Sequence, residues 1–127
     1  MPGKSVAQKL LIKENYTVLL LNEPEHYRSI LGELPDNVTV LGEPGIPADL
    51  VQVFFTAKKE VEEHLEKLKS SLKPGGLLWL TYPKGTSKQK TDVNRDIIWE
   101  IAKRYGFQAV AMISVDNTWS AMRLKVV

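Results

Sequence analysis

Residues 49–82 read DLVQVFFTAKKEVEEHLEKLKSSLKPGGLLWLTY and contain one complete strand–helix–strand unit. The run Leu50 to Phe55 is short and apolar, which is typical of a strand buried on both faces. Between Lys58 and Ser71, apolar residues recur every three or four positions among Glu and Lys, as on a helix with one buried face. The turn Leu72 to Gly76 leads into a second apolar run, Leu77 to Leu80. Two strands joined by a helix lie parallel in one sheet, so this stretch predicts an α/β fold.

The alternation of helices and strands continues toward the N-terminus. Ser5 is a suitable N-cap for a short helix, and Tyr16 to Leu21 is a second run apolar enough for a central strand. A helix is expected from Pro24 to Gly32, since proline suits the first helical turn and glycine the residue after the last. Val38 to Leu41 is a further strand. The loop Gly42 to Pro47 holds too many prolines and glycines for regular structure.

The C-terminal part predicts one more helix and a closing hairpin. A polar tract spans Pro83 to Lys90, and Thr91 or Asp92 caps the helix that follows it. Two strands, Ala109 to Val115 and Ala121 to Val127, are separated by a few residues only. A connection that short forces the two strands to lie antiparallel.

The order of these elements resembles the Rossmann-like domain of S-adenosylmethionine-dependent methyltransferases. The turn Leu72 to Gly76 is similar to the turn in the second half of that domain, which also ends in a hairpin with one antiparallel strand. The resemblance covers most of the chain, but one helix–strand unit of the family's fullest form is missing after Val38 to Leu41. It implies a three-layer α/β/α sandwich, with a mostly parallel sheet of strand order about 2-1-3-4-6-5.

A second resemblance rests on shorter motifs. Tyr82-Pro83-Lys84 and the segment Val115 to Ser120 are similar to motifs in a family of short bacterial proteins of unknown function. This resemblance brings no activity with it.

A ligand cleft is expected where strand order reverses, between the first strand and the third, beyond the carboxyl ends of the strands. The side chains that follow these strands are the candidates for binding: Asn22, Glu23, Gly42, Glu43, Thr56 and Tyr82. The methyltransferase resemblance implies that Glu43 takes the place of the acidic residue that holds the ribose hydroxyls.

The cofactor half of the resemblance is incomplete. Leu21 to Glu25 stands where the family has a glycine-rich loop, and Glu23 and Glu25 would place negative charge at a helix N-terminus, where it stabilises the helix. The third strand continues into Thr56-Ala57-Lys58 and not into the Asn/Asp-Pro-Pro-Tyr signature of amino-group methyltransferases. We therefore expect no cofactor, and S-adenosylmethionine is the one candidate if a cofactor binds.

The densest basic cluster consists of Lys84, Lys88 and Lys90, with Arg95 nearby. Such a cluster could contact a phosphate or a nucleic-acid backbone, although the spacing is not that of a P-loop and no aromatic residues interleave with it. The other interpretation is a solvated loop. His26 and His64 have no partners at metal-ligand spacing, so no metal site is expected.

The three tryptophans divide into one core residue and two surface candidates. Trp79 alternates within a buried strand. Trp99 falls off the apolar stripe of its helix and Trp119 lies at the hairpin connection, so both are candidates for a partner or oligomer surface. Packing under a loop is the alternative for both.

Length and composition narrow the function classes. A chain of 127 residues with 43% hydrophobic content fits one domain, spanning residues 1–127. The net charge of +2 does not require nucleic acid or membrane, and the absence of cysteine fits a reducing compartment, so a cytoplasmic location is expected. The leading hypothesis is a non-enzymatic domain that binds a partner protein or its own copy. The alternatives are a divergent S-adenosylmethionine-dependent methyltransferase and a weak anion or nucleic-acid binder.

Overall fold

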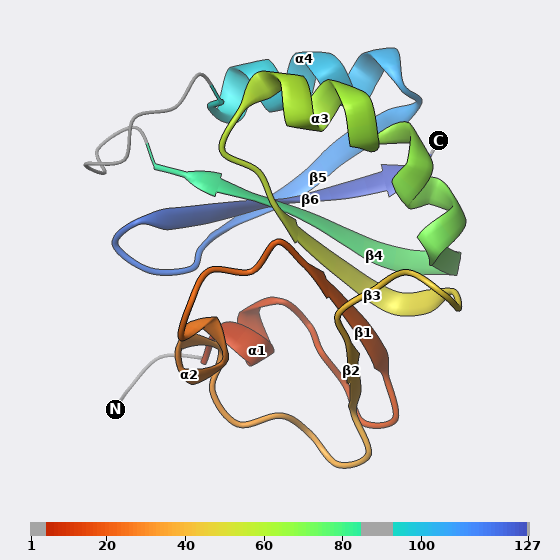
Figure 1. The fold of residues 1–127 in the computed structure, drawn as a ribbon, viewed down its shortest axis with the longest axis vertical. Coiled ribbons are helices and arrows are strands. Elements are labelled where there is room, and N and C mark those ends of the chain that lie inside the picture. The colour runs from red at the N-terminus through yellow and green to blue at the C-terminus, as the bar shows by residue number, and fades with distance from the viewer. Residues whose placement is uncertain (1–4, 85–92, 127) are drawn as a thin grey trace.

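The computed structural model describes residues 5–84 and 93–126, which form a sheet with helices on both faces (Figure 1). The strands are β1 (Thr17–Leu21), β2 (Thr39–Leu41), β3 (Ala48–Phe54), β4 (Leu72–Pro83), β5 (Phe107–Ser114) and β6 (Trp119–Val126). The helices are α1 (Val6–Lys9), α2 (Tyr27–Leu31), α3 (Lys58–His64), the 3-10 helix η1 (Glu66–Ser71) and α4 (Arg95–Arg104). The strand order is β2-β1-β3-β4-β6-β5, which confirms the predicted order.

The pairing of the strands also follows the prediction. β1 pairs in parallel with β2 and β3, and β3 pairs in parallel with β4. β6 runs antiparallel to both of its neighbours, β4 and β5. The sheet is therefore parallel except for β6, as the closing hairpin required.

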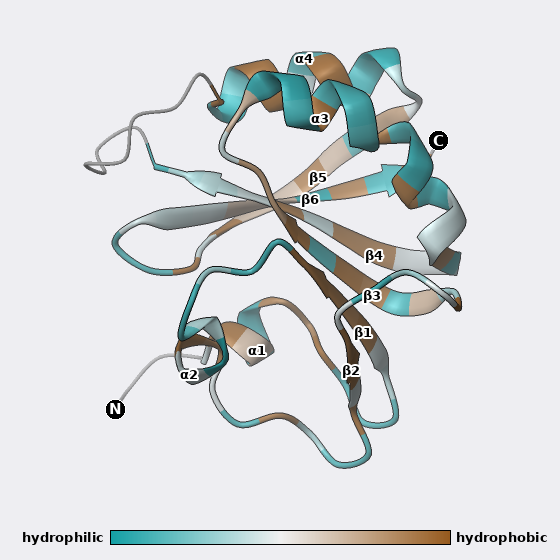
Figure 2. Ribbon diagram, in the orientation of Figure 1, coloured by the Kyte–Doolittle hydropathy of each residue, from teal (hydrophilic) through white to brown (hydrophobic). Residues whose placement is uncertain are grey.

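The core consists of two apolar layers, one on each face of the sheet. α3, η1 and α4 cover one face, and α1 and α2 cover the other (Figure 1). Figure 2 shows apolar strands between helices whose outer faces are hydrophilic. Trp79 lies in the layer under α1, only 1% exposed, and its indole N–H donates a hydrogen bond to the Leu10 carbonyl at 3.0 Å. The predicted core position of Trp79 is confirmed.

One polar chain runs through the apolar layer under α1 and α2. The Tyr27 hydroxyl donates to Gln52 Oε1 at 2.7 Å, and Gln52 Nε2 donates to Thr81 Oγ1 at 3.0 Å. All three side chains are at most 1% exposed. Because buried polar groups are costly without partners, this chain links α2 to the two central strands β3 and β4 in one specific arrangement.

The crossover from β2 to β3 contains no helix. β2 and β3 lie on opposite sides of β1, and the six residues Gly42 to Pro47 connect them. Parallel strands are usually joined by a dozen or more residues. Here the lateral step is only about 10 Å, two strand spacings, and six residues can span about 20 Å when extended. The loop predicted at 42–47 is confirmed. It takes the place of a helical crossover and is called the crossing loop below.

The segment between α3 and β4 differs from the prediction. The helix expected from 58 to 71 is α-helical only to His64 and continues as the 3-10 helix η1. Leu72–Gly76, expected as a turn before the strand, belongs to β4, where Ala48 pairs with Leu72 and Leu50 pairs with Leu77. β4 thus advances five residues while β3 advances two, so the excess residues loop out.

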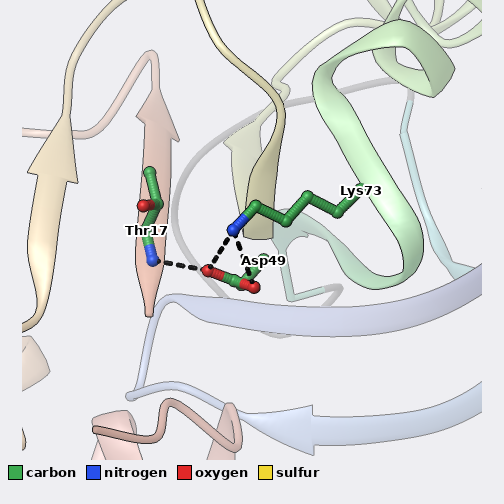
Figure 3. Close-up of polar contacts among 3 residues, drawn as sticks. All are labelled: Thr17, Asp49 and Lys73. Atoms are coloured by element: carbon green, nitrogen blue, oxygen red, sulfur yellow. Dashed lines mark hydrogen bonds and ion pairs between the residues drawn. The ribbon is translucent and has the colours of Figure 1, made fainter. Parts of the chain in front are cut away.

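Contacts with the neighbouring strands β1 and β3 fix the looped-out residues of β4 in place. Gly75 has φ +78°, and a Cβ on Gly76 would lie 2.9 Å from the Lys73 carbonyl oxygen. The Lys73 ammonium pairs with the Asp49 carboxylate at 3.2 Å, and Asp49 also accepts the backbone N–H of Thr17 (Figure 3). The excursion in β4 is therefore tied to the first residues of β1 and β3.

Two helix starts also differ from the prediction. α2 begins at Tyr27, after His26 in the left-handed conformation (φ 63°), because residues 24–27 form a separate turn closed by a hydrogen bond from Tyr27 N–H to the Pro24 carbonyl. α4 is capped by Asn94, whose side chain accepts the Ile97 N–H at 2.9 Å. Thr91 and Asp92 lie outside the described residues. β5 and β6 each begin two residues earlier than predicted.

A search of the described residues found no helix that combines the length and the apolar character needed to span a bilayer.

Candidate functional site

A cavity of about 460 Å³ opens between β1, β3 and η1, at the point where strand order reverses. Its lining comes from the ends of β1 and β3, from the crossing loop and from the α3–η1 segment: Leu21, Asn22, Pro44, Val53, Phe55, His64, Lys67, Leu68, Ser70 and Ser71. The floor is apolar and the rim carries amide, imidazole, ammonium and hydroxyl groups. This composition and volume are typical of small-molecule sites.

Asn22 is the predicted site residue that lines this cavity. It follows β1 directly and has φ 58°, the left-handed conformation that asparagine tolerates better than most residues with a side chain. His26, at the other end of the same loop, is also left-handed. The loop after β1 therefore adopts, at two positions, backbone angles that are most common for glycine. At one of these positions Asn22 places a side-chain amide in the lining of the cavity.

His64 and Lys67 are site residues that the sequence interpretation missed. The His64 ring stacks on Phe55 with a centroid distance of 6.4 Å and an interplanar angle of 9°. Lys67 lines the cavity from η1 and makes no ion pair among the described residues. Their spacing of three residues places both beside the buried stripe of Val61, Leu65 and Leu68, but that spacing alone does not show that they face a cavity.

Glu23 does not stabilise the N-terminus of α2, contrary to the prediction for Glu23 and Glu25. α2 begins at Tyr27, and no acidic residue lies in its first turn. The Glu23 carboxylate instead pairs with the Arg28 guanidinium, at 3.3 Å, and its side chain is 26% exposed. Glu25 lies within the turn that precedes the helix and Glu23 lies just before that turn, so both are too early in the chain to act on the first helical turn.

Thr56 lies at the carboxyl end of β3 and is engaged with the start of α3. Glu60 Oε1 accepts hydrogen bonds from the Thr56 N–H and the Ala57 N–H, both at 3.1 Å, and from the Thr56 hydroxyl at 3.3 Å. One carboxylate oxygen thus satisfies the backbone at this helix start. The segment after β3 is organised to begin a helix.

Glu43 and Gly42 lie on the crossing loop and are exposed. Glu43 directly precedes Pro44, which lines the cavity, but Glu43 itself is not one of the lining residues. A Cβ added to Gly42 would meet nothing within 4 Å, so no close packing requires a glycine at this position.

Tyr82 lies at a different cavity from Asn22, so the fold does not gather all the predicted cleft residues. This second cavity, of about 450 Å³, lies at the start of α4 and includes Tyr82, Lys84 and Arg95. Tyr82 is 4% exposed, and burial raises the pKa of its phenol. The Lys84 ammonium donates to Ser114 Oγ at 2.6 Å. Lys88 and Lys90, predicted with Lys84 as an anion site, lie outside the described residues.

The two tryptophans proposed for a partner surface have different environments. Trp99 on α4 is 48% exposed. Trp119 is 8% exposed and packs edge-on against Phe54, with ring centroids 5.2 Å apart. For Trp119 the alternative, packing within the protein, is what the structure shows, because the end of β3 at Phe54 and the start of β6 at Trp119 meet under α2.

The part of the chain that the structure describes holds no group of three or more His, Asp or Glu side chains able to bind a metal ion.

Comparison with solved structures places this architecture among methyltransferases. A SAM-dependent methyltransferase from Aquifex aeolicus aligns with a TM-score of 0.66 and 21% identity, over 95% of this chain and 89% of its own. A DhpI–SAH complex aligns with a TM-score of 0.64 and 16% identity, over 95% and 82% of the two chains. The B. subtilis M1A22 tRNA methyltransferase TrmK aligns with a TM-score of 0.60 and 10% identity, over 100% and 67%.

The sequence comparisons add no family to this result. No protein-family model matches the chain, and no curated protein matches it. Identities of 10–21% show a common fold and leave the activity open. This chain has the Rossmann-like fold of SAM-dependent methyltransferases, with a helix-free crossover between its second and third strands.

Proposed function

We propose that this chain is a ligand-binding domain that holds an adenosyl ligand of the S-adenosylmethionine class in the cavity between β1, β3 and η1. The observation that carries the proposal is the position of that cavity, at the switch point of an open α/β sheet, where ligands of such folds bind. Proteins of the same fold have been solved as DhpI–SAH and DhpI–SAM–HEP complexes, which supports the choice of ligand class.

The chemistry of the lining fits such a ligand. Lys67 supplies an ammonium group and His64 an imidazole, and the residues that line the cavity include no Asp or Glu, so an anionic group such as a ligand carboxylate is favoured there. Phe55 and Val53 supply an apolar floor on which a flat base can pack. Glu43, next to the lining residue Pro44 in the sequence, is the acceptor proposed for ribose hydroxyls.

The proposal assigns binding and not methyl transfer. The segment after β3 would present groups to a methyl acceptor in a methyltransferase, but here Glu60 accepts the N–H groups of both Thr56 and Ala57. Opening that segment would break the start of α3. The hydrogen-bonded segment after β3 is therefore suited to binding a ligand without rearranging.

Thermal unfolding with S-adenosylmethionine or S-adenosylhomocysteine tests the proposal. A ligand present at 100 times its dissociation constant stabilises the folded state by about 2.7 kcal/mol. Lys67→Ala should weaken binding, whereas Lys59→Ala, on the outer side of α3 with its side chain 85% exposed, should leave binding unchanged. The absence of any stabilisation by either ligand at millimolar concentration would refute the binding site.

A separate assay tests the claim that the domain binds its ligand without transferring a methyl group. The protein is incubated with S-adenosylmethionine and a cell extract, and release of S-adenosylhomocysteine is compared with that of the Lys67→Ala variant. Release equal to background supports a binding role. Release that depends on Lys67 would identify a methyltransferase instead.

A further inference from the structure

The edge strand β5 lacks two of the features that usually protect a sheet edge, charged residues and proline. Its eight residues, FQAVAMIS, include no charged residue and no proline. Edge strands of natural proteins are commonly short, or carry lysine or proline, because unpaired backbone groups invite another strand. The opposite edge follows this rule, since β2 has only three residues. β5 is therefore the edge at which another strand can add.

Exposed apolar side chains lie beside this edge on the α4 face. Trp99 is 48% exposed and Met112 is 47% exposed, and they line one cavity of about 530 Å³ between α4 and β5. Tryptophan and methionine are enriched in protein interfaces, where large apolar side chains are withdrawn from water. Burial of Trp99 and Met112 in an interface would remove two large exposed apolar side chains from contact with water.

We propose that the occupant of this surface is a second copy of the chain, with β5 pairing antiparallel to β5 about a two-fold axis perpendicular to the sheet. A two-fold interface brings the same patch against itself, so the patch must be self-complementary. An uncharged strand meets this condition, because no like charges face each other across the new pair. The two sheets then form one continuous sheet.

The charges on α4 fit the same symmetry. Asp96 precedes Trp99 by three residues and Lys103 follows it by four, so all three lie along one side of the helix. The Lys103 ammonium lies 4.5 Å from the centre of the Trp99 ring. The two-fold axis places both copies of α4 on the same face of the sheet and antiparallel, which brings Lys103 of one copy toward Asp96 of the other.

A bulge limits the strength of the pairing. The register between β5 and β6 shifts between Ala109 and Ala111, which leaves Val110 as the extra residue, 41% exposed. Regular pairing is therefore available mainly from Ala111 to Ser114. We expect a dimer that dissociates on dilution and weakens at high salt, because part of its stabilisation comes from exposed charges.

Sedimentation equilibrium over a range of concentrations tests the dimer. The mass should rise from 14.3 kDa toward twice that value as concentration increases. Met112→Lys places a charge in the middle of the edge strand, close to the same charge in the second copy, and this variant should remain monomeric with an unchanged circular dichroism spectrum. Ile46→Lys is the matched control, since Ile46 is 59% exposed on the crossing loop and should leave the mass of the protein unchanged.

Fluorescence quenching locates the interface independently. Trp79 and Trp119 are 1% and 8% exposed, so an aqueous quencher reports mainly on Trp99. Quenching should fall as the dimer forms and stay constant in Met112→Lys. If that variant fails to fold, Val110→Lys replaces it. A wild-type protein that stays monomeric at all concentrations, or a dimer that both lysine variants leave intact, would overturn the proposal.

Discussion

The Asp49 carboxylate at the start of β3 accepts a hydrogen bond from the backbone N–H of Thr17, the first residue of β1, at 2.8 Å (Figure 3). The same carboxylate pairs with Lys73 in the excursion of β4. One side chain therefore connects three neighbouring strands near the amino-terminal ends of β1 and β3.

This arrangement predicts a pH-dependent contribution to stability. The Thr17 N–H and the Lys73 ammonium favour the charged form of Asp49 and lower its pKa below the ordinary value for aspartate. The unfolded chain then binds the proton more readily, so the stabilisation is present above the unfolded pKa and is lost as pH falls through the folded pKa. Asp49→Asn should lower the free energy of unfolding at pH 7 by about 1 kcal/mol.

Denaturant unfolding of wild type and Asp49→Asn at several pH values measures this difference. The difference should shrink as the pH is lowered below the folded pKa. Asp36→Asn, which changes an exposed carboxylate with no side-chain hydrogen bond in the described part of the chain, is the control. A difference that persists unchanged in acid would contradict the assignment.

Tyr27→Phe should destabilise the protein through the buried polar chain. The substitution removes the hydroxyl that donates to Gln52 Oε1 and leaves that oxygen buried without its partner. The expected cost is about 1–3 kcal/mol. Chemical denaturation measures it against Tyr16→Phe, a half-buried tyrosine outside this chain of hydrogen bonds. Equal stabilities of the two variants would show that the Tyr27–Gln52 bond contributes little.

Alkaline titration should show delayed ionisation of two buried tyrosines, Tyr27 and Tyr82. Burial raises the pKa of both phenols above the ordinary value for tyrosine. Above pH 10 the unfolded state loses these protons while the folded state keeps them, so stability falls as pH rises. Tyrosinate absorbance should show two groups that ionise only as the protein unfolds. Ionisation of all four tyrosines before any loss of circular dichroism would disprove this.

Gly76→Ala should be more costly than Gly45→Ala. A Cβ on Gly76 would lie 2.9 Å from the Lys73 carbonyl oxygen and 3.2 Å from that of Asp49, both backbone atoms that cannot move alone. The expected loss is about 1–3 kcal/mol, as for other overpacked sites. A Cβ on Gly45 would meet nothing within 4 Å. Thermal unfolding of both variants checks the difference, and a neutral Gly76→Ala would show that the excursion of β4 can relax.

The proposed ligand site was only partly visible in the sequence. Asn22 could be placed because it follows a buried strand, and the carboxyl ends of parallel strands mark the ligand edge of a sheet. His64 and Lys67 could not be assigned, since a helical pattern shows which side is buried but not which surface side chains face a cavity. Tyr82 was grouped with Asn22, although its side chain points toward α4 and lines another cavity.

The position of the strands and the direction of most of them could be predicted from the sequence, whereas their order came from the resemblance to the methyltransferase domain. Short apolar runs must be buried, a helix between two strands favours a parallel arrangement, and a connection as short as that between β5 and β6 favours an antiparallel one. Each of these constraints acts over a few adjacent residues, so it can be recognised without knowing the rest of the fold.

Only the tertiary structure decided which similar side chains are buried. Trp99 and Trp119 both lie outside any apolar pattern, yet Trp119 packs on Phe54 and Trp99 remains open to water. Likewise, nothing in the sequence distinguishes Asp49 from the other acidic residues. Only the fold brings the Thr17 N–H and the Lys73 ammonium into contact with its carboxylate. These environments arise from contacts between segments far apart in the chain, and local sequence patterns carry no information about such contacts.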